Sequence, residues 1–538
     1  MIEATYDYVV VGGGAAGCVL AARLAAESGK TVALIERGRP DTNRWIHIPA
    51  TFFKALQSQD AEAVLSEADP SLDGAHFPVP QGRVLGGGSS VNGMIYMRGQ
   101  AQDYDDWADR YGCDGWSYKD VLPVFIRQEN NQRIENRFHG NCGKLSVADP
   151  TPAHPVSKVA IEAAVNEGIA PSDDFNGANQ EGVGWYQVTA VDGQRQSSAH
   201  CFLKPELNRE NLTLKTNVLV ERIRFENKRA VALEARSDDG AELIINAREE
   251  IILTAGSFQS PKLLMLSGVG PRDQLDKHGI EAVCDSPNVG RNYQDHVGTP
   301  VTRELKGMQG LYGADKGFKA LKHGFNYFTA KRGLLMSNLL DAGACVDTSG
   351  CGRPDVQFNI APFAPSAPGT PPMACHAVQV HPMTMRPTSR SRLGLKSTDP
   401  ADAPLFESRA LDTEADFDTL RRGVRLAQAI FAQPPLREIV GDEIWPGADV
   451  NTVQGSNSFD DAIRAHARTI FHPAGTCAMG GQIDSVVDTQ LRVRGVEGLR
   501  VADCSVMPAL VSGNTNAPTM MIADRCADFI LGVEPGTA

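Results

Sequence analysis

The stretch from Tyr8 to Gly38, "YVVVGGGAAGCVLAARLAAESGKTVALIERG", decides the fold. It begins with an apolar run, continues through glycines into an Ala- and Leu-rich segment, and ends in a second apolar run from Val32 to Ile35. Short apolar runs bounded by glycine favour buried strands, whereas alanine and leucine favour a helix. The stretch therefore predicts a strand, helix, strand unit of an α/β fold.

The glycines of this unit have the spacing Gly12-x-Gly14-x-x-Gly17. The first two permit a tight turn and a close approach of backbone N–H groups to a pyrophosphate, and the third lets the helix pack on the sheet. Glu36, about twenty residues further on, has the position of a carboxylate that accepts a ribose hydroxyl. The unit predicts a dinucleotide site that FAD or NAD could fill, whereas Glu36 would repel the 2'-phosphate of NADP. The residues expected to contact the dinucleotide are Gly12, Gly14, Ala15, Ala16, Gly17, Glu36 and Arg37.

A second glycine-rich block, "GRVLGGGSSVNGMIYMRG", covers Gly82 to Gly99. No strand precedes it and no acidic residue follows at the required distance, so it is not a second fingerprint of the same kind. A flexible loop is one interpretation. Its glycines alternate with Ser89, Ser90 and Asn92, however, and this composition suits a loop pressed against a large planar ligand with polar edges.

The chain resembles the glucose-methanol-choline (GMC) family of FAD-dependent oxidoreductases, whose first signature is similar to this block. The second signature is similar to "GSFQSPKLLMLSGVG", Gly256 to Gly270, where a strand from Glu250 to Thr254 precedes a helix. We expect Pro261 near the first turn of that helix and Gly268 just past its end. Further similar segments are "DDFNGANQEGVGWYQ", "VGRNYQDH", "HPAGTCAMG" and the segment from Gly498 to Ile530, so the resemblance covers nearly the whole chain.

The resemblance implies an FAD site and several of its contacts. Val91 stands where some family members carry a histidine covalently bound to the flavin, and valine has no nucleophile, so we expect non-covalent FAD. Asp503 is similar to the ribityl-binding position, and Val220 to the residue whose backbone meets the adenine. The remaining expected contacts are Arg83, Val84, Gly88, Ser89, Asn92, Gly93, Met94, Ile95, Cys504, Pro518 and Thr519.

The segment "IFHPAGTCAMG", Ile470 to Gly480, contains no carboxylate, lysine or arginine, and His472 is its one readily titratable side chain. An isolated histidine of this kind is commonly a hydrogen-bonded core residue. In the family, however, the histidine of this motif lies over the flavin and acts as the catalytic base, beside a His or Asn that the resemblance assigns to Asn516. Oxidation of an alcohol requires a base near neutral pKa, which imidazole supplies.

The closing segment "NAPTMMIADRCADFI" predicts a helix with Pro518 in its first turn. If its N-terminus faces the flavin, its partial positive charge would stabilise the anion that develops as hydride arrives. The alternative is a helix that only docks on the protein.

The resemblance also implies a division of the chain. A Rossmann-like FAD-binding domain would consist of residues 1–155, 198–298 and 462–538. A discontinuous substrate-binding domain, built on an antiparallel sheet flanked by helices, would consist of 156–197 and 299–461. The proline-rich loop from Pro362 to Pro372 could cover the site, and the acidic segment Asp60 to Gly74 departs from the family pattern.

Composition limits the classes of partner. The 538 residues carry a formal charge of -13, which disfavours binding to nucleic acid and to anionic membranes. No transmembrane segment, export signal or metal site is predicted, and eleven scattered cysteines fit a reducing, cytoplasmic location.

The sequence thus predicts an FAD-dependent alcohol dehydrogenase that converts a primary alcohol to the aldehyde by hydride transfer to flavin N5. It looks most similar to bacterial L-sorbose and polyethylene glycol dehydrogenases, and no aromatic and carboxylate cluster for choline is evident. A quinone, a redox protein or O2 could accept the electrons. An alcohol oxidase and a flavin-containing hydroxynitrile lyase are the alternatives.

Overall fold

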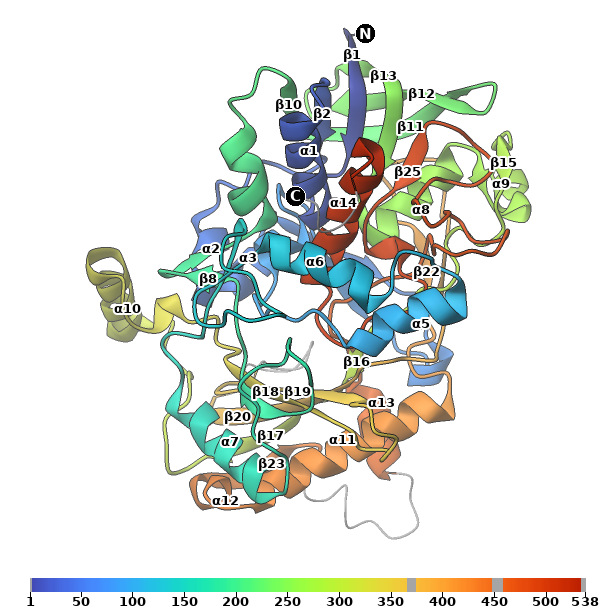
Figure 1. Cartoon of the computed structure of the whole chain (residues 1–538). Helices are drawn as coiled ribbons and strands as arrows, with labels where there is room; N and C mark the ends of the chain where they lie inside the picture. The colour runs from blue at the N-terminus through green and yellow to red at the C-terminus, as the bar shows by residue number, and fades with distance from the viewer. Residues whose placement is uncertain (1, 365–373, 448–457, 534–538) are drawn as a thin grey trace.

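The computed structural model describes residues 2–364, 374–447 and 458–533. Two sheets organise this part of the chain, one in each half of the molecule (Figure 1). The first sheet and the helices around it occupy the upper half of the view, and the second sheet lies in the lower half with helices below it.

The first sheet has the strand order β10-β2-β1-β13-β12-β11, and β25 also pairs with β13. The strands β10, β2, β1, β13 and β25 run parallel, whereas β12 and β11 add an antiparallel hairpin. Their bounds are β1 Ile2–Val11, β2 Val32–Ile35, β10 Leu212–Lys215, β11 Val218–Glu226, β12 Arg229–Ser237, β13 Glu242–Leu253 and β25 Leu499–Val501. With α1 (Ala15–Glu27) between β1 and β2, the predicted strand, helix, strand unit is confirmed.

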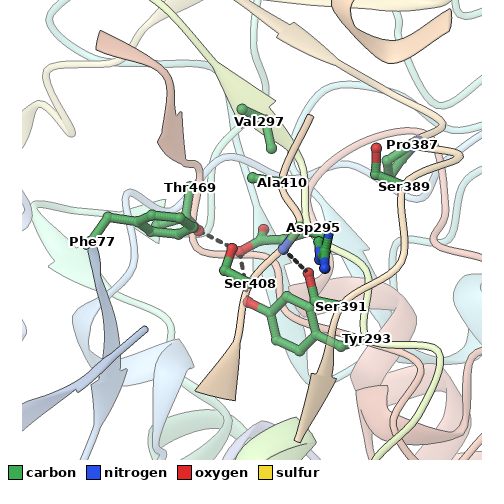
Figure 2. A pocket seen from close by; sticks show the side chains of 11 residues that line it. Phe77, Tyr293, Asp295, Val297, Pro387, Ser389, Ser391, Ser408, Ala410 and Thr469 are labelled. Carbon is green, nitrogen blue, oxygen red and sulfur yellow. Dashed lines mark hydrogen bonds between the residues drawn. The ribbon is translucent and has the colours of Figure 1, made fainter. Parts of the chain in front are cut away.

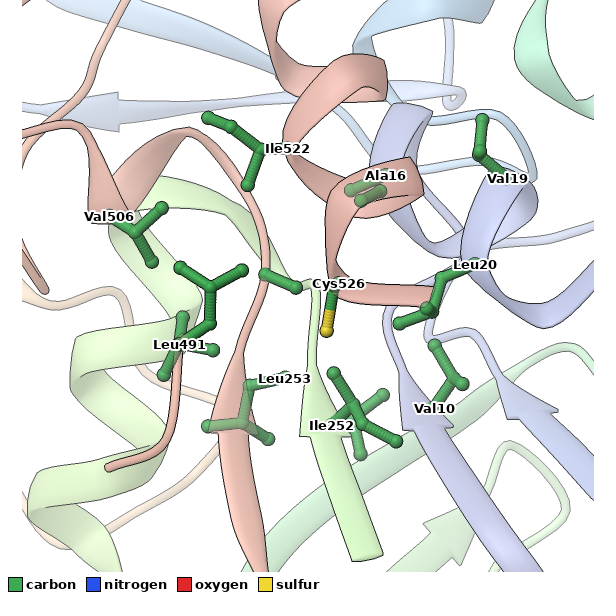
Figure 3. Packing of buried hydrophobic residues seen from close by; sticks show 14 of the residues in the cluster. Val10, Ala16, Val19, Leu20, Ile252, Leu253, Leu491, Val506, Ile522 and Cys526 are labelled. Atoms are coloured by element: carbon green, nitrogen blue, oxygen red, sulfur yellow. The ribbon is translucent and has the colours of Figure 1, made fainter. Parts of the chain in front are cut away.

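Helices α1, α8 (Gly256–Leu266) and α14 (Asn516–Leu531) pack on this sheet through apolar side chains. Figure 3 shows Leu20 of α1, Ile252 of β13 and Cys526 of α14 within one buried cluster. An ionic contact also joins the helices, because Arg23 of α1 pairs with Asp524 and with Asp528 of α14, the latter at 2.7 Å. The closing segment is therefore helical, as predicted.

The second sheet is antiparallel throughout, with the order β23-β17-β20-β19-β18-β7 and with β16 and β24 beside it. Its strands are β7 Gly182–Trp185, β16 Val297–Gly298, β17 Val301–Leu305, β18 Ala342–Val346, β19 Val356–Ala361, β20 Ala377–Thr384, β23 Val440–Trp445 and β24 Arg468–Thr469. Helix α11 (Glu414–Ala432) packs against this sheet through Leu420, Val424 and Phe431, all fully buried. The mixed α/β class with an antiparallel second sheet is confirmed.

Two short strands join the second sheet from segments predicted for the FAD-binding part. β16 lies in 198–298 and β24 in 462–538. They pair with each other, and β16 also pairs with β20. His472 follows β24 by three residues, so the second sheet helps to position it.

One helix boundary differs from the prediction. Helix α8 begins at Gly256, so Pro261 lies inside the helix and not near its first turn. The start is earlier because Asp503 accepts a hydrogen bond from the Gly256 backbone N–H at 2.8 Å and caps the helix from a distant part of the chain. Gly268 ends the helix with φ +84°, as expected.

The other described elements are shorter or peripheral. Among the described residues, none of the helices combines the length and hydropathy needed to cross a membrane. The remaining helices are α2 Arg44–His47, α3 Phe52–Leu56, α4 Gly88–Val91, α5 Ala101–Tyr111, α6 Tyr118–Gln128, α7 Pro155–Asn166, α9 Arg272–Lys277, α10 Gly317–Ala330, α12 Leu436–Ile439 and α13 Ser458–His466. The remaining strands are β3 Ala61–Leu65, β4 Pro78–Gly82, β5 Glu129–Asn131, β6 Leu145–Val147, β8 Ala190–Val191, β9 Gln194–Arg195, β14 Val269–Gly270, β15 Cys284–Asp285, β21 Arg392–Gly394 and β22 Leu405–Glu407.

Candidate active site

A cavity of about 1040 Å³ lies between the two sheets. At one end it is lined by residues where β1 and β2 finish, including Gly12 and Glu36, and at the other end by His472. Ligands of α/β sheets bind outside the carboxyl ends of the parallel strands. The position of the cavity thus matches that of a dinucleotide site.

The glycines at the first end are required by close packing. A Cβ on Gly12 would lie 2.7 Å from the Thr254 carbonyl oxygen, and the backbone there has φ +103°. A Cβ on Gly17 would overlap the Gly12 carbonyl oxygen and lie 2.7 Å from Thr254 Oγ1. These contacts leave the backbone at the turn free to approach a ligand, with α1 packed tightly behind it.

Glu36 ends β2 with a buried carboxylate that faces the glycine turn. It accepts hydrogen bonds from the backbone N–H of Gly13 at 2.6 Å and of Gly38 at 2.5 Å. Burial raises the pKa of Glu36, and the two N–H donors oppose that shift. The neighbouring Arg37 forms an ion pair with Glu62 on β3, and both side chains line the cavity.

Most of the predicted cofactor residues line the cavity, and three do not. Gly17 lies behind the turn, and Val84 is fully buried among Ile46, Ala55 and Val91. Pro518 is buried in the first turn of α14 but does not reach the cavity. The predicted contact residues that do line it are Gly12, Gly14, Ala15, Ala16, Glu36, Arg37, Arg83, Gly88, Ser89, Asn92, Gly93, Met94, Ile95, Val220, Asp503, Cys504 and Thr519.

Arg195 supports the second glycine block and was not predicted. Its guanidinium is fully buried and donates to Asn92 Oδ1 at 2.6 Å and to the Ser89 carbonyl at 3.1 Å. Burial lowers the pKa of Arg195 to about 9. Arg195 thereby holds Asn92 at the cavity wall; no motif in the sequence distinguishes this arginine from a surface one.

His472 lies in a loop that Asp295 holds in place. The Asp295 carboxylate accepts the backbone N–H of His472 at 2.9 Å and the Tyr293 hydroxyl at 3.2 Å, and it also accepts the Thr469 hydroxyl. Figure 2 shows Asp295, Tyr293 and Thr469 around a small pocket behind the loop. Burial raises the pKa of Asp295 to about 7. These contacts hold Phe471 at φ +69°, a conformation that costs a non-glycine residue about 1–3 kcal/mol.

Two hydrogen bonds determine which ring nitrogen of His472 carries its proton. Asn514 Nδ2 donates to His472 Nε2 at 3.2 Å, and its amide orientation is set by Gln357 Nε2, which donates to Asn514 Oδ1 at 3.2 Å. His472 Nε2 is therefore an acceptor, and Nδ1 carries the proton. His472 Nδ1 lies 2.8 Å from His296 Nδ1 and donates to it.

The other side of His296 agrees with this assignment. His296 Nε2 lies 3.0 Å from the Met385 carbonyl oxygen, which can only accept, so His296 Nε2 carries the proton and its Nδ1 is free to accept from His472. His296 was not singled out from the sequence, although it ends the quoted segment "VGRNYQDH".

The hydrogen bond to His472 Nε2 corrects one predicted residue. Asn514 makes it, and not Asn516, which the resemblance suggested. Asn516 is the first residue of α14 and lines the same cavity. The chain turns between them, so the side chain two residues before the helix is the one that reaches the imidazole.

Both imidazoles are buried and neutral near pH 7. Burial, with a smaller contribution from His296, lowers the pKa of His472 well below its usual value. Burial lowers the pKa of His296 to about 4. A neutral His472 with a lone pair on Nε2 can accept a proton inside the cavity.

The second sheet contributes a row of polar side chains to the cavity wall. Asn359 of β19 is the cross-strand partner of His381 on β20, and Gln379 of β20 is the partner of Thr302 on β17. Among the described residues, three buried polar atoms of this wall have no hydrogen-bond partner: Asn359 Oδ1, His381 Nε2 and Trp445 Nε1. These three atoms are enclosed by protein, whereas the uncharged polar side chains of this wall line the cavity and are suited to a polar ligand.

The only charged residue that strands of this sheet contribute to the described cavity wall is Arg468 of β24. The acidic residues that line the cavity are Glu36, Glu62 and Asp503, which lie on the side of the first sheet or on β3. The Asp503 carboxylate accepts hydrogen bonds from the Gly256 backbone N–H and from the Ser260 hydroxyl, the latter at 2.6 Å. The cavity wall around His472 therefore carries no carboxylate among the described residues, because Asp295 lines the small pocket behind the loop and not this cavity.

The predicted loop from Pro362 to Pro372 falls mostly in residues 365–373, outside the described residues. Phe363, at its start, lines the cavity and packs against Phe53 of α3 with 5.4 Å between ring centroids. In the segment Asp60 to Gly74, β3 pairs with β4 and carries Glu62 to the cavity.

Comparison of this sequence with models of known protein families identifies its family. The model of the N-terminal part of GMC oxidoreductases matches residues 6–298, and the model of the C-terminal part matches residues 387–523. This chain belongs to the GMC oxidoreductase family. It is therefore an oxidoreductase of the FAD-dependent kind that acts on CH–OH groups with an acceptor other than NAD(P).

Several GMC relatives match over almost the entire chain. An oxygen-dependent choline dehydrogenase of Brucella anthropi is 38% identical and an alcohol dehydrogenase [acceptor] of Pseudomonas putida is 38% identical, each over 98% of this chain and 96% of the relative. The mitochondrial choline dehydrogenase of Mus musculus is 39% identical over 98% of this chain and 89% of its own.

Among solved structures, pyridoxine 4-oxidase from Mesorbium loti superposes with a TM-score of 0.87 at 29% identity, covering 97% of this chain and 98% of the other. Formate oxidase superposes with a TM-score of 0.90 at 24% identity, covering 99% of each chain, and this likeness concerns the fold.

The cavity fits FAD on the evidence of its own residues. A buried carboxylate for a ribose and a turn of obligatory glycines lie at one end, and a neutral imidazole lies at the other. Between them, the first residues of α14 line the cavity, and no side-chain hydrogen bond caps that helix N-terminus. The helix N-terminus thus presents a partial positive charge to the space where a flavin ring would lie.

Proposed function

We propose that this GMC oxidoreductase oxidises an uncharged primary alcohol to the aldehyde, with His472 as the base and with FAD bound without a covalent link. The observation that carries the proposal is the neutral His472, whose Nε2 lone pair is held in the cavity beside Asn514. Bound FAD would supply the hydride acceptor.

The residues around His472 support the chemistry of proton removal. The substrate hydroxyl would replace Asn514 Nδ2 as the donor to the one lone pair of His472 Nε2, and Asn514 Nδ2 would then donate to the alcohol oxygen and orient it. As Nε2 takes the proton, the imidazolium keeps donating through Nδ1 to His296, whose neutral Nδ1 remains an acceptor. The N-terminus of α14 would stabilise negative charge that develops at the cofactor.

The wall of the second sheet supports an uncharged substrate. A choline-like cation would meet a wall to which the described strands of the second sheet contribute Arg468 and no carboxylate. The uncharged polar side chains of Thr302, Asn359 and Gln379, which line the same wall, favour instead an alcohol that carries further hydroxyl or ether oxygens. According to this proposal, the substrate of this chain differs from that of the choline dehydrogenases among its relatives.

Val91 and Cys504 support non-covalent FAD. Val91 lines the cavity without a nucleophilic atom, and burial raises the pKa of Cys504 to about 12, so its thiol stays protonated. Denaturing precipitation should release FAD to the supernatant. A yellow precipitate that retains the flavin would refute this part of the proposal.

Anaerobic stopped-flow mixing tests the function. Purified holoenzyme is mixed with aliphatic, benzylic, polyol and ether alcohols, with choline, and with a hydroxy acid, while flavin absorbance is followed. We expect bleaching with uncharged primary alcohols and much slower bleaching with choline. The variant His472→Ala should keep its flavin spectrum but bleach more slowly by a factor on the order of hundreds.

Two results would overturn the proposal. Choline as the fastest substrate would contradict an uncharged substrate, and unchanged bleaching in His472→Ala would contradict the base. Return of the flavin colour in air separates the second candidate, an alcohol oxidase, from the dehydrogenase that we favour. The oxidase is kept because pyridoxine 4-oxidase is among the structural neighbours. An absence of bleaching with every alcohol would favour the lyase.

A further inference from the structure

Helix α10 presents a stripe of large apolar side chains to solvent. Phe318, Leu321, Phe325 and Phe328 are 80%, 72%, 67% and 64% exposed. Their spacing of three, four and three residues places all four on one face of the helix. In Figure 1 this helix stands at the left edge of the molecule, away from both sheets. An isolated exposed apolar residue needs no explanation, but a contiguous stripe of four does.

The opposite face of α10 attaches the helix to the protein. Tyr327 is the buried residue of this helix, and its hydroxyl donates to the Gly193 carbonyl at 2.7 Å. Tyr327 follows Phe325 by two residues, about 200° around the helix axis. The attachment therefore points the apolar stripe away from the body of the protein.

Cations surround the stripe. The segment from Tyr312 to Arg332 contains one acidic residue, Asp315. Its five cations are Lys316, Lys319, Lys322, Lys331 and Arg332. All five are exposed, and within the described residues none of them forms a salt bridge. The whole chain carries -13, so this patch opposes the charge of the rest of the surface.

We propose that α10 docks the protein on the surface of a bilayer that contains anionic phospholipids. The helix would lie in the plane of the interface, with Phe318, Leu321, Phe325 and Phe328 among the acyl chains and the lysines at the headgroups. An amphipathic helix with aromatic residues on one face and lysines beside it has the composition of such interfacial helices.

The charges favour lipid over a second copy of the chain. A symmetric dimer through the apolar stripe would bring two sets of five cations together, with only Asp315 of each segment to oppose them. Anionic headgroups, in contrast, complement both the apolar face and the cations. A short segment of chain joins the docked helix to the cavity wall, because η5 (Leu334–Met336) follows α10 and Leu340 lines the cavity.

Vesicle sedimentation tests the proposal independently of the proposed function. Holoenzyme is incubated with phosphatidylcholine vesicles, or with vesicles of phosphatidylcholine and phosphatidylglycerol in equal amounts, and pelleted. We expect the protein to pellet with the anionic vesicles, to remain soluble with the neutral ones, and to be released by high salt.

Matched variants locate the surface. The variant Phe318→Ser, Leu321→Ser, Phe325→Ser and Phe328→Ser should lose at least tenfold in apparent vesicle affinity, and so should Lys316→Gln, Lys319→Gln and Lys322→Gln. The control Ile2→Ser, Leu65→Ser and Ile483→Ser removes side chains that are 58%, 59% and 87% exposed elsewhere, and it should bind like wild type. None of these residues lines the cavity, so flavin spectra and alcohol-dependent bleaching in solution should be unchanged.

Three results would overturn the proposal. The first is a wild-type protein that stays soluble with anionic vesicles. The second is a stripe variant that pellets like wild type. The third is a lipid-free dimer, seen by light scattering, that the stripe variant abolishes, because that would assign the face to a second copy.

Discussion

Asn514 and Asn516 differ by two positions, but only Asn514 donates to His472 Nε2. The sequence places a polar pair just before the proline of a predicted helix, and both members are equally suited by residue type. The choice depends on the turn at Gly513, where φ is +142°, and on the start of α14 at Asn516. Neither is visible in residue type, so the sequence predicts the motif and the base but not the partner.

The two asparagines provide a matched test. We expect Asn514→Ala to slow flavin reduction by about tenfold to a hundredfold, because it removes a hydrogen bond to the base and the substrate oxygen worth about 1.5–3 kcal/mol. Asn516→Ala should slow it by less than about threefold, within the scatter for a group that makes no hydrogen bond to the reacting atoms. Stopped-flow reduction at saturating alcohol measures both, with FAD content as the control. A larger effect of Asn516→Ala would show that Asn516, which the family resemblance suggested, is the partner of the base.

The buried position of His472 predicts the acid limb of the pH profile. Its pKa is lowered well below 6.5 by burial and by His296, so the neutral, proton-accepting form is still the main form at pH 6.5. The rate of flavin reduction should therefore begin to fall only as the pH drops below 6.5 through the lowered pKa. The measurement is anaerobic reduction from pH 5 to 8, with retained FAD checked at each pH. Half-loss of the rate at or above pH 6.5 with FAD still bound would contradict a buried neutral base.

At the scale of elements, local sequence predicts the helices and strands whose ends are determined by residues nearby in the chain. The unit β1, α1 and β2 follows its apolar runs and glycines. Helix α8 begins earlier than its local sequence predicts, because its first N–H is capped by Asp503, which is 247 residues away in sequence. Val84 also resembled a cofactor contact in its motif, yet it packs with Ile46, Ala55 and Val91 in a separate core. Long-range contacts of this kind leave no local pattern.

The packing of α1 on the glycine turn predicts opposite effects for two glycine replacements within helices. In Gly17→Ala the new methyl group would overlap the Gly12 carbonyl oxygen, so we expect loss of FAD binding and a strongly lowered melting temperature. In Gly324→Ala of α10 the methyl group meets open space, and the helix should gain up to about 1 kcal/mol. Thermal unfolding monitored by circular dichroism compares them. Equal melting temperatures for the two variants would contradict the close contact at Gly17.

At the scale of the whole molecule, average properties conceal the features that matter most. The charge of -13 disfavours an anionic membrane surface, yet the segment from Lys316 to Arg332, which contains α10, carries five cations and four exposed apolar residues. In the active site, too, the sequence does not show which residues lie together. His296, His472 and Asn514 come from three separate segments: the pairing of β16 with β24 brings the two histidines together, and Asn514 reaches His472 from just before α14. Sequence motifs name the family, and the tertiary pairing of strands determines which residues touch.

The cavity between the two sheets predicts that FAD stabilises the whole fold. A ligand that binds only the folded chain adds about 2.7 kcal/mol when its concentration is one hundred times its Kd, so apoprotein should melt several degrees below holoenzyme and recover with added FAD. Glu36→Ala removes the carboxylate expected at the ribose and should require a higher FAD concentration for half of that recovery. The concentration dependence is the readout, because loss of the bonds to Gly13 and Gly38 lowers the intrinsic stability as well. His472→Ala is the control: its recovery should follow that of wild type, since the imidazole lies at the other end of the cavity. Recovery of Glu36→Ala at the wild-type FAD concentration would show that Glu36 supports the glycine turn and contributes nothing to cofactor affinity.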